Sequence, residues 1–140
     1  QGYHSDITRT VVLGEASEKH RELYHTVLEA QLLGVKSLYV GISGKEADRI
    51  VRDFLTQEGY GENFGHGLGH SVGLEIHEEP RLSPKSRAEH LAEGTVVTVE
   101  PGVYLPGWGG LRIEDTVLLE KRGGVPLTKA AKHLIEITQG

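Results

Sequence analysis

Cysteine is absent from this chain of 140 residues, and so is methionine. Without cysteine, the chain can hold neither a disulfide framework nor a metal site built on thiolates. The absence of disulfides fits a reducing compartment, so we expect a cytoplasmic protein. Because the first residues, QGYHSDITRT, do not include an initiator methionine, we expect a chain that is cut or processed at that end.

Long apolar runs are missing too. None approaches the roughly 18 residues that a membrane-spanning helix needs, and the first residues lack the charged and apolar regions of a signal peptide. We therefore expect no membrane partner. The net charge of −5 comes from mixed signs, which argues against nucleic acid as a partner. With 37% hydrophobic residues, the chain can bury a core as one domain or as part of one.

The hydrophobic pattern divides the chain into a helical first half and a strand-rich second half. Apolar residues at helical spacing, preceded by the N-caps Ser17 and Ser43, predict helices over residues 16–38 and 43–61. Alternating and β-branched segments predict strands, separated by glycine-rich turns, over residues 4–13, 95–105, 111–120 and 133–137, with turns at 106–110 and 121–126. Helices followed by an antiparallel sheet predict an α+β fold.

One glycine-rich segment, FGHGLGHSVGLEIHEEP at residues 64–80, contains three histidines. Its glycines make a helix improbable. In an extended chain His66 and His70 share one face, whereas strict alternation places His77 on the opposite face. Either the chain bends, for example at Gly73, or His77 serves something else. The alternative is that these histidines are ordinary polar groups on the surface of a glycine-rich strand.

Three acids lie in or at the end of predicted strands: Asp6 in SDITRTVV, Glu114 in LRIEDTVLL, and Glu100 at the end of TVVTVE, where Pro101-Gly102 turns the chain. A carboxylate within a strand is costly unless it is paired, hydrogen-bonded or bound to a cation. An exposed strand face, or ion pairs such as Asp6 with Arg9 and Glu114 with Arg112, would also explain them. Carboxylates with imidazole and no sulfur suit Mn²⁺, Fe²⁺, Co²⁺ or Zn²⁺. Such a site can bridge two ions and activate a water for hydrolysis.

Four ordered segments carry a family resemblance: SDITRT, GHGLGHSVGLEIHEEP, TVEPGVY and RIEDT. Together they resemble the metallopeptidases of the pita-bread fold. Methionine aminopeptidases share this fold and ligand pattern. However, HSVGLEIHE is more similar to the proline-specific branch, which contains the Xaa-Pro aminopeptidases and the Xaa-Pro dipeptidases (prolidases). The resemblance implies helices packed on a curved, largely antiparallel sheet. It also implies a peptide substrate with proline at the second position.

The same resemblance implies roles for individual residues. Asp6 and Glu114 would bridge two divalent ions, Mn²⁺ first among the candidates, while His70 and Glu100 would complete the shell of one ion. Glu100 would also act as general base towards the attacking water. His77 would contact the scissile carbonyl or the developing oxyanion.

The resemblance implies two further roles beside the metal ligands. His66 would line the substrate cavity. Arg112, two residues before Glu114 and on the same strand face, would support the acids as a nearby cation.

In one respect the chain departs from the family pattern. The family has five protein ligands, and its first Asp would fall upstream of Gln1. The family also pairs two similar halves around the site. We therefore expect residues 1–140 to be part of a catalytic domain, mostly its C-terminal half. Such a chain would hold one ion firmly, be weakly active or inactive, and self-associate as a homo-oligomer through uncovered apolar surface.

Two other classes of protein share this scaffold. One is a non-catalytic pita-bread module that binds peptides, and the other is a hydrolase of a different C–N bond, similar to creatinase. Both would be expected to lack the full metal set. The presence of Asp6, His70, Glu100 and Glu114 in this sequence therefore favours the peptidase.

Overall fold

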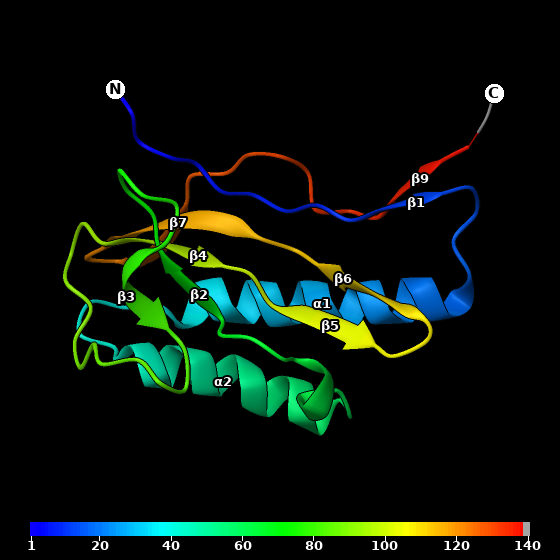
Figure 1. Ribbon diagram of the computed structural model, residues 1–140, viewed down its shortest axis with the longest axis horizontal. Helices are drawn as coiled ribbons and strands as arrows, with labels where there is room; N and C mark the ends of the chain where they lie inside the picture. The colour runs from blue at the N-terminus through cyan, green and yellow to red at the C-terminus, as the bar shows by residue number, and fades with distance from the viewer. Residues whose placement is uncertain (139–140) are drawn as a thin grey trace.

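Two helices form one layer of the molecule. The computed structural model describes residues 1–138 and contains α1, Glu18–Ser37, and α2, Gly44–Gln57. Ser17 caps α1 and Ser43 caps α2, each through a hydroxyl oxygen that accepts a backbone N–H of the first turn. The two helices lie side by side on one side of the strands (Figure 1). Both helices and both caps agree with the prediction from sequence.

A five-stranded sheet forms the second layer, with the strands in the order β3-β2-β4-β7-β8. Every neighbouring pair in it is antiparallel. The strands are β2 (Gly69–Ser71), β3 (Glu78–Leu82), β4 (Val96–Val99), β7 (Asp115–Glu120) and β8 (Gly123–Pro126). Helices packed on this sheet confirm the predicted α+β, largely antiparallel fold.

Two smaller pairs of strands complete the fold. Strands β5, Gly102–Leu105, and β6, Gly109–Arg112, form an antiparallel hairpin. Strand β1, Val11–Leu13, pairs in parallel with β9, Ile135–Ile137, so segments from opposite ends of the chain lie together (Figure 1). A short 3₁₀ turn, η1 at Gly61–Asn63, follows α2. Neither helix of residues 1–138 combines the length and the apolar character that a bilayer crossing requires.

Three predictions of strand extent were wrong. The first strand covers only Val11–Leu13 instead of residues 4–13, and the strand expected over 111–120 is broken between β6 and β7. The predicted turn at 121–126 contains β8, because Gly123 adopts a φ of +121° and closes a tight turn back onto β7. Pro126 is tolerated in β8 because this strand lies at the edge of the sheet.

Helix α1 packs closely against the sheet and against α2 at Gly34. A Cβ at this position would lie 2.8 Å from Cγ1 of Val99 in β4 and 3.2 Å from Cγ2 of Val51 in α2. Only glycine therefore allows the three elements to approach this closely. Val99 and Val51 are fully buried. Because Val99 is the last residue of β4, this contact fixes the strand end from which Glu100 projects.

Candidate metal centre

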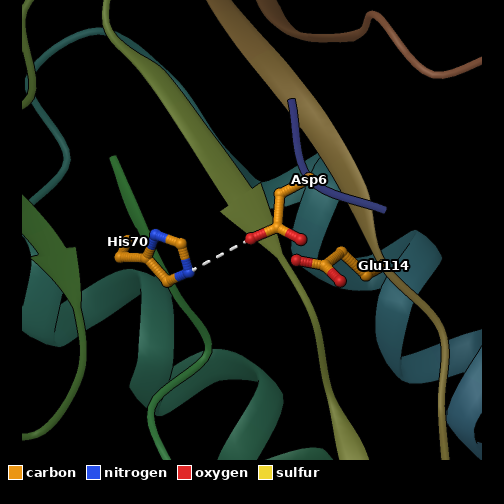
Figure 2. A group of neighbouring side chains, drawn as sticks. All are labelled: Asp6, His70 and Glu114. Atoms are coloured by element: carbon orange, nitrogen blue, oxygen red, sulfur yellow. Dashed lines mark ion pairs between the residues drawn. The ribbon is translucent and has the colours of Figure 1, made fainter. Parts of the chain in front are cut away.

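Acidic and imidazole side chains from four separate segments converge in the structure. Asp6, His70 and Glu114 each offer one ligand atom, and these atoms lie within 4.8 Å of one another. In Figure 2 the carboxylates of Asp6 and Glu114 lie next to each other, with the His70 ring beside Asp6. Oε1 of Glu100 is 3.1 Å from Nε2 of His70, and Oδ2 of Asp6 is 3.7 Å from the same nitrogen. The structure thus brings together all four side chains that the sequence suggests as ligands.

The pairing of β4 with β7 places Glu100 and Glu114 at the same point of the sheet. Val99, the last residue of β4, lies opposite Asp115, the first residue of β7. Glu100 directly follows the one strand and Glu114 directly precedes the other, so their side chains lie near each other. Glu114 does not lie inside a continuous strand as expected. It lies between β6 and β7, and its backbone N–H donates to the Thr8 carbonyl at 3.1 Å.

Asp6 reaches the site from an extended segment ahead of β1. Its carbonyl accepts a hydrogen bond of 2.7 Å from the Thr116 hydroxyl of β7. The ion pair between Asp6 and Arg9, considered as an alternative, does not form: Nη2 of Arg9 lies 2.8 Å from Oδ1 of Asp115. The Asp6 carboxylate is therefore left facing His70 and Glu114.

Strand β2 carries His70 close against β4. A Cβ at Gly69 would lie 1.9 Å from the Thr98 carbonyl oxygen, so only glycine allows this approach. The Thr98 hydroxyl accepts the His70 backbone N–H at 3.0 Å and donates to Oε1 of Glu100 at 2.9 Å. Thr98 therefore connects the two ligand-bearing strands.

The electrostatic environment of the site is that of crowded negative charge. Burial raises the pKa of Glu114, as do the negative charges of Glu100 and Asp6, against the lowering effect of the Thr8 hydroxyl. Burial by itself would lower the pKa of His70, but its hydrogen bonds raise that pKa overall, the one to Glu100 first among them. Such a set of buried and half-buried oxygen and nitrogen donors suits a divalent cation, which would neutralise the charge.

His77 lies beside His70, with 4.3 Å between the ring centroids. The chain turns back between β2 and β3, and the Gly73 carbonyl in this turn accepts the His4 backbone N–H at 2.8 Å. The chain therefore bends, which was the first of the two alternatives for His77. Residues 70–77 do not form a continuous strand, so the alternation of side chains between two faces does not place His77 opposite His70.

A cavity of about 370 Å³ opens beside the converging side chains. His66 lies at its wall, with Nε2 2.9 Å from the Tyr104 hydroxyl. The lining combines imidazole, carboxylate and guanidinium groups, among them His66, His70, His77, Glu100, Arg81 and Arg112. The cavity is therefore polar and adjoins the candidate ligands directly.

Arg112 acts on Glu114 through an intermediate residue. Nε of Arg112 donates to the Thr8 hydroxyl at 3.1 Å, and this hydroxyl donates in turn to Oε2 of Glu114. Because the strand breaks between Arg112 and Glu114, the argument that both share one strand face was wrong. The expected proximity of Arg112 to the acids nevertheless exists, as a relay and not as a direct ion pair.

Three residues of the site were not identified from the sequence: Thr8, Thr98 and Tyr104. Thr8 and Thr98 stand two residues from Asp6 and Glu100 in extended segments, so the period of two could have placed each on the face of its acid. Tyr104, which contacts His66, gave no such signal, because β5 and the glycine-rich segment are distant in sequence.

Comparison with known proteins adds a family match. The model for metallopeptidase family M24 matches residues 1–121. The Xaa-Pro dipeptidase of Pyrococcus horikoshii is 53% identical over 135 residues, a match that covers 96% of this chain and 38% of that protein. The chain therefore spans about 38% of the length of this curated relative.

Solved structures show the same similarity. The Xaa-Pro dipeptidase from Bacillus anthracis superposes with a TM-score of 0.91 at 51% identity, over 96% of this chain and 38% of that one. The X-Pro aminopeptidase from Thermotoga maritima superposes with a TM-score of 0.92 at 44% identity, with the same two coverages of 96% and 38%. These matches extend over nearly all of the chain, and the family match over residues 1–121 includes Asp6, His70, Glu100 and Glu114.

Proposed function

Because this chain belongs to metallopeptidase family M24, we propose that Asp6, His70, Glu100 and Glu114 bind divalent metal ions in an enzyme that cleaves Xaa-Pro peptide bonds. The observation that carries this proposal is the convergence of the four side chains. Ligand atoms of Asp6, His70 and Glu114 lie within 4.8 Å of one another, and Glu100 lies 3.1 Å from His70. We propose Mn²⁺ as the native ion, with Co²⁺, Fe²⁺ or Zn²⁺ as alternatives, because oxygen and imidazole donors suit all four.

The substrate we propose is a dipeptide or a longer peptide with proline at its second position. The names of the relatives support this choice, since they include Xaa-Pro dipeptidases and an X-Pro aminopeptidase. The cavity of about 370 Å³ beside the candidate ligands is of a size to take a dipeptide. We expect neither nucleic acid nor a membrane as a partner.

The side chains around the cavity would perform distinct parts of the hydrolysis. Bound divalent ions would supply a water whose pKa is low enough for it to act as a nucleophile. Glu100 would accept the proton of the attacking water. His77 would donate a hydrogen bond to the scissile carbonyl oxygen as negative charge develops there. His66 would hold the substrate at the cavity wall, and Arg112 would orient Glu114 through Thr8.

We further propose that the 140 residues are part of a larger catalytic domain, to which sequence outside them would add a fifth ligand. The share of 38% that the chain covers in its relatives supports this proposal. With Asp6, His70, Glu100 and Glu114 alone, one ion would be held firmly and the second weakly. The isolated chain would then hydrolyse Xaa-Pro bonds weakly or not at all.

Exposed apolar residues support the proposal that the isolated chain self-associates as a homo-oligomer. Val11 and Leu13 of β1 are 45% and 83% exposed, and their partners Ile135 and Ile137 of β9 are 40% and 49% exposed. The paired side chains form a small apolar surface, which a second copy could cover.

Peptidase assays on the natural protein that contains this chain test the proposed function. The protein is freed of metal and supplied with Mn²⁺, and the hydrolysis of an Xaa-Pro dipeptide is compared with that of the matching Xaa-Ala dipeptide. We expect hydrolysis that requires both the metal and proline. Equal cleavage with and without Mn²⁺, or no preference for proline, would contradict the proposal. A Glu100→Gln variant provides an inactive control, because it removes the proposed base and a ligand together.

A further inference from the structure

Asp115, the residue after Glu114, is completely buried and belongs to a network of its own. It is 0% exposed. Oδ1 accepts from Nη2 of Arg9 at 2.8 Å, and Oδ2 accepts from Nε2 of Gln31 at 2.9 Å and from Nζ of Lys132. The carboxylate thus connects the N-terminal segment, helix α1 and the segment before β9. Two of its three side-chain partners, Arg9 and Lys132, are cations that form ion pairs with the carboxylate.

Arg9 distributes its donors over the segments that carry two of the proposed ligands. Nη1 donates to the carbonyl of Glu114 at 2.6 Å and to that of Thr8 at 2.9 Å. Its other nitrogens donate to the carbonyls of Ala130 and Ala131 at 2.8 and 3.0 Å. The planar guanidinium, oriented by Asp115, therefore connects the backbone of Glu114 to the extended segment that bears Asp6.

Side chains, more than backbone bonds, hold residues 6–10 against residues 112–116. The backbone pairing is an isolated bridge between Thr8 and Glu114. Besides the bonds of Arg9 and Arg112, threonine hydroxyls join the two segments: that of Thr116 donates to the Asp6 carbonyl at 2.7 Å, and that of Thr10 donates to the Arg112 carbonyl at 2.8 Å. A regular ladder would maintain this register through repeated backbone bonds. Here the spacing of Asp6 and Glu114 depends on individual side chains.

We propose that Arg9, oriented by Asp115, is a positioning residue for the metal centre: it sets the distance between the carboxylates of Asp6 and Glu114. Thr116 has the same role towards Asp6. This inference rests on the proposed function, because it assumes that the two carboxylates share metal ions. None of these three residues is itself a proposed ligand. Partners of a metal ligand change metal affinity by about 10- to 100-fold when they are altered.

A positioning role and a purely structural role of Arg9 and Thr116 predict different metal affinities in the folded variants. A general loss of stability leaves the spacing of Asp6 and Glu114 unchanged in those molecules that remain folded. A change at Arg9 or Thr116 alters this spacing in every folded molecule. The affinity for Mn²⁺, measured where all variants are folded, therefore separates positioning from stability.

Three variants of the natural protein test the proposal. Arg9→Lys keeps the positive charge but loses the planar array of donors, and Thr116→Val removes one hydroxyl with little change of volume. Leu55→Val shortens a fully buried side chain in α2, a helix that carries no proposed ligand, and controls for lost stability. Circular dichroism first confirms that each variant is folded at the temperature of the calorimetric titration with Mn²⁺. We expect affinity to fall about tenfold for Arg9→Lys and severalfold for Thr116→Val, but less than twofold for Leu55→Val.

The outcomes distinguish this inference from the proposed function. If the parent binds Mn²⁺ and both variants bind it equally well, or if Leu55→Val loses as much affinity as Arg9→Lys, positioning is refuted while the metal centre stands. If the parent binds no Mn²⁺, the proposed function fails and this inference fails with it. Should Arg9→Lys not fold, Thr116→Val decides the question alone.

Discussion

Asp48 and Arg52 form an ion pair one helical turn apart on α2, with Nε of Arg52 2.8 Å from Oδ2 of a carboxylate that is 1% exposed. Both side chains of this pair also form hydrogen bonds with the backbone of the glycine-rich segment, residues 64–80. Oδ1 of Asp48 accepts the Leu68 backbone N–H at 2.9 Å, and Arg52 donates to two carbonyls of the same segment. Because this segment leads directly into β2, helix α2 fixes where the strand that carries His70 begins.

Replacing Asp48 by asparagine should therefore destabilise the protein. The substitution removes a buried anion that accepts one backbone N–H and pairs with Arg52, so we expect a loss of about 2 kcal/mol in the free energy of unfolding. Urea denaturation measures this loss. Asp53→Asn is the matched control, because Asp53 pairs with Arg49 at the same helical spacing on an exposed surface. It should change the free energy by less than about 0.5 kcal/mol, and equal losses would argue against the importance of burial.

Two glycines of the glycine-rich segment should differ in their tolerance of alanine. Gly69→Ala places a Cβ 1.9 Å from the Thr98 carbonyl oxygen, whereas a Cβ at Gly65 meets no atom within 4 Å. We expect Gly69→Ala to destabilise the protein by about 2–3 kcal/mol and to weaken Mn²⁺ binding, since β2 must move away from β4. Gly65→Ala should alter neither property. Thermal unfolding and calorimetric titration measure both, and a tolerated alanine at 69 would contradict the close approach of the strands.

Glu114→Gln should separate metal binding from the stability of the metal-free protein. Loss of a proposed bridging carboxylate should weaken Mn²⁺ binding by more than the roughly 10- to 100-fold expected for a ligand's partner. The metal-free variant should nevertheless be at least as stable as the parent at neutral pH, because the raised pKa of Glu114 reflects an ionised form that the fold disfavours.

The raised pKa of Glu114 also predicts how the stability difference between the parent and Glu114→Gln depends on pH. As pH rises through the ionisation of Glu114, only the parent acquires a buried charge next to Glu100 and Asp6. The stability of the metal-free parent relative to the variant should therefore fall with rising pH. Denaturation of both proteins in chelator at several pH values measures this trend. A variant that binds Mn²⁺ as tightly as the parent would remove Glu114 from the ligand set.

His77→Gln should lower catalysis without releasing metal. His77 lies 4.3 Å from His70, measured between ring centroids, but is not among the proposed ligands. If it donates to the developing oxyanion, kcat should fall by about 100- to 1000-fold while KM changes little. Steady-state kinetics and metal analysis on the natural protein measure both. His25→Gln, at an exposed position on α1, is the control. Loss of Mn²⁺ from the His77 variant would instead mark this histidine as a ligand.

The apolar surface of β1 and β9 should govern self-association of the 140-residue chain. Leu13 and Ile137 lie opposite each other in the two strands and are 83% and 49% exposed. We expect light scattering to give a mass above that of the monomer, with an increase at higher concentration. The double variant Leu13→Lys and Ile137→Lys should shift the mass towards that of the monomer. A chain that is monomeric before substitution would contradict this prediction.

Local sequence predicted the helical layer well. Apolar spacing and the serines at 17 and 43 placed both helices and their N-caps, because helix formation depends on contacts within three or four residues. The antiparallel character of the sheet also followed from alternation and turns. The extents of the strands did not, since pairing depends on partners that are distant in the chain. The break before Glu114, for example, arises where its N–H turns to the carbonyl of Thr8.

The chemical type of the residues suggested that Asp6, Glu100 and Glu114 act with a histidine of the glycine-rich segment, since acids in predicted strands and imidazole without cysteine favour a hard or borderline divalent cation. The family resemblance singled out His70 as that histidine. Only the tertiary structure decided how these groups meet. Contacts such as Val99 opposite Asp115 and Thr8 opposite Glu114 join segments that local patterns cannot align. Ligand spacing is a matter of ångströms, and it is set by packing and hydrogen bonds between residues up to about a hundred positions apart, for which a single sequence carries no periodic signal.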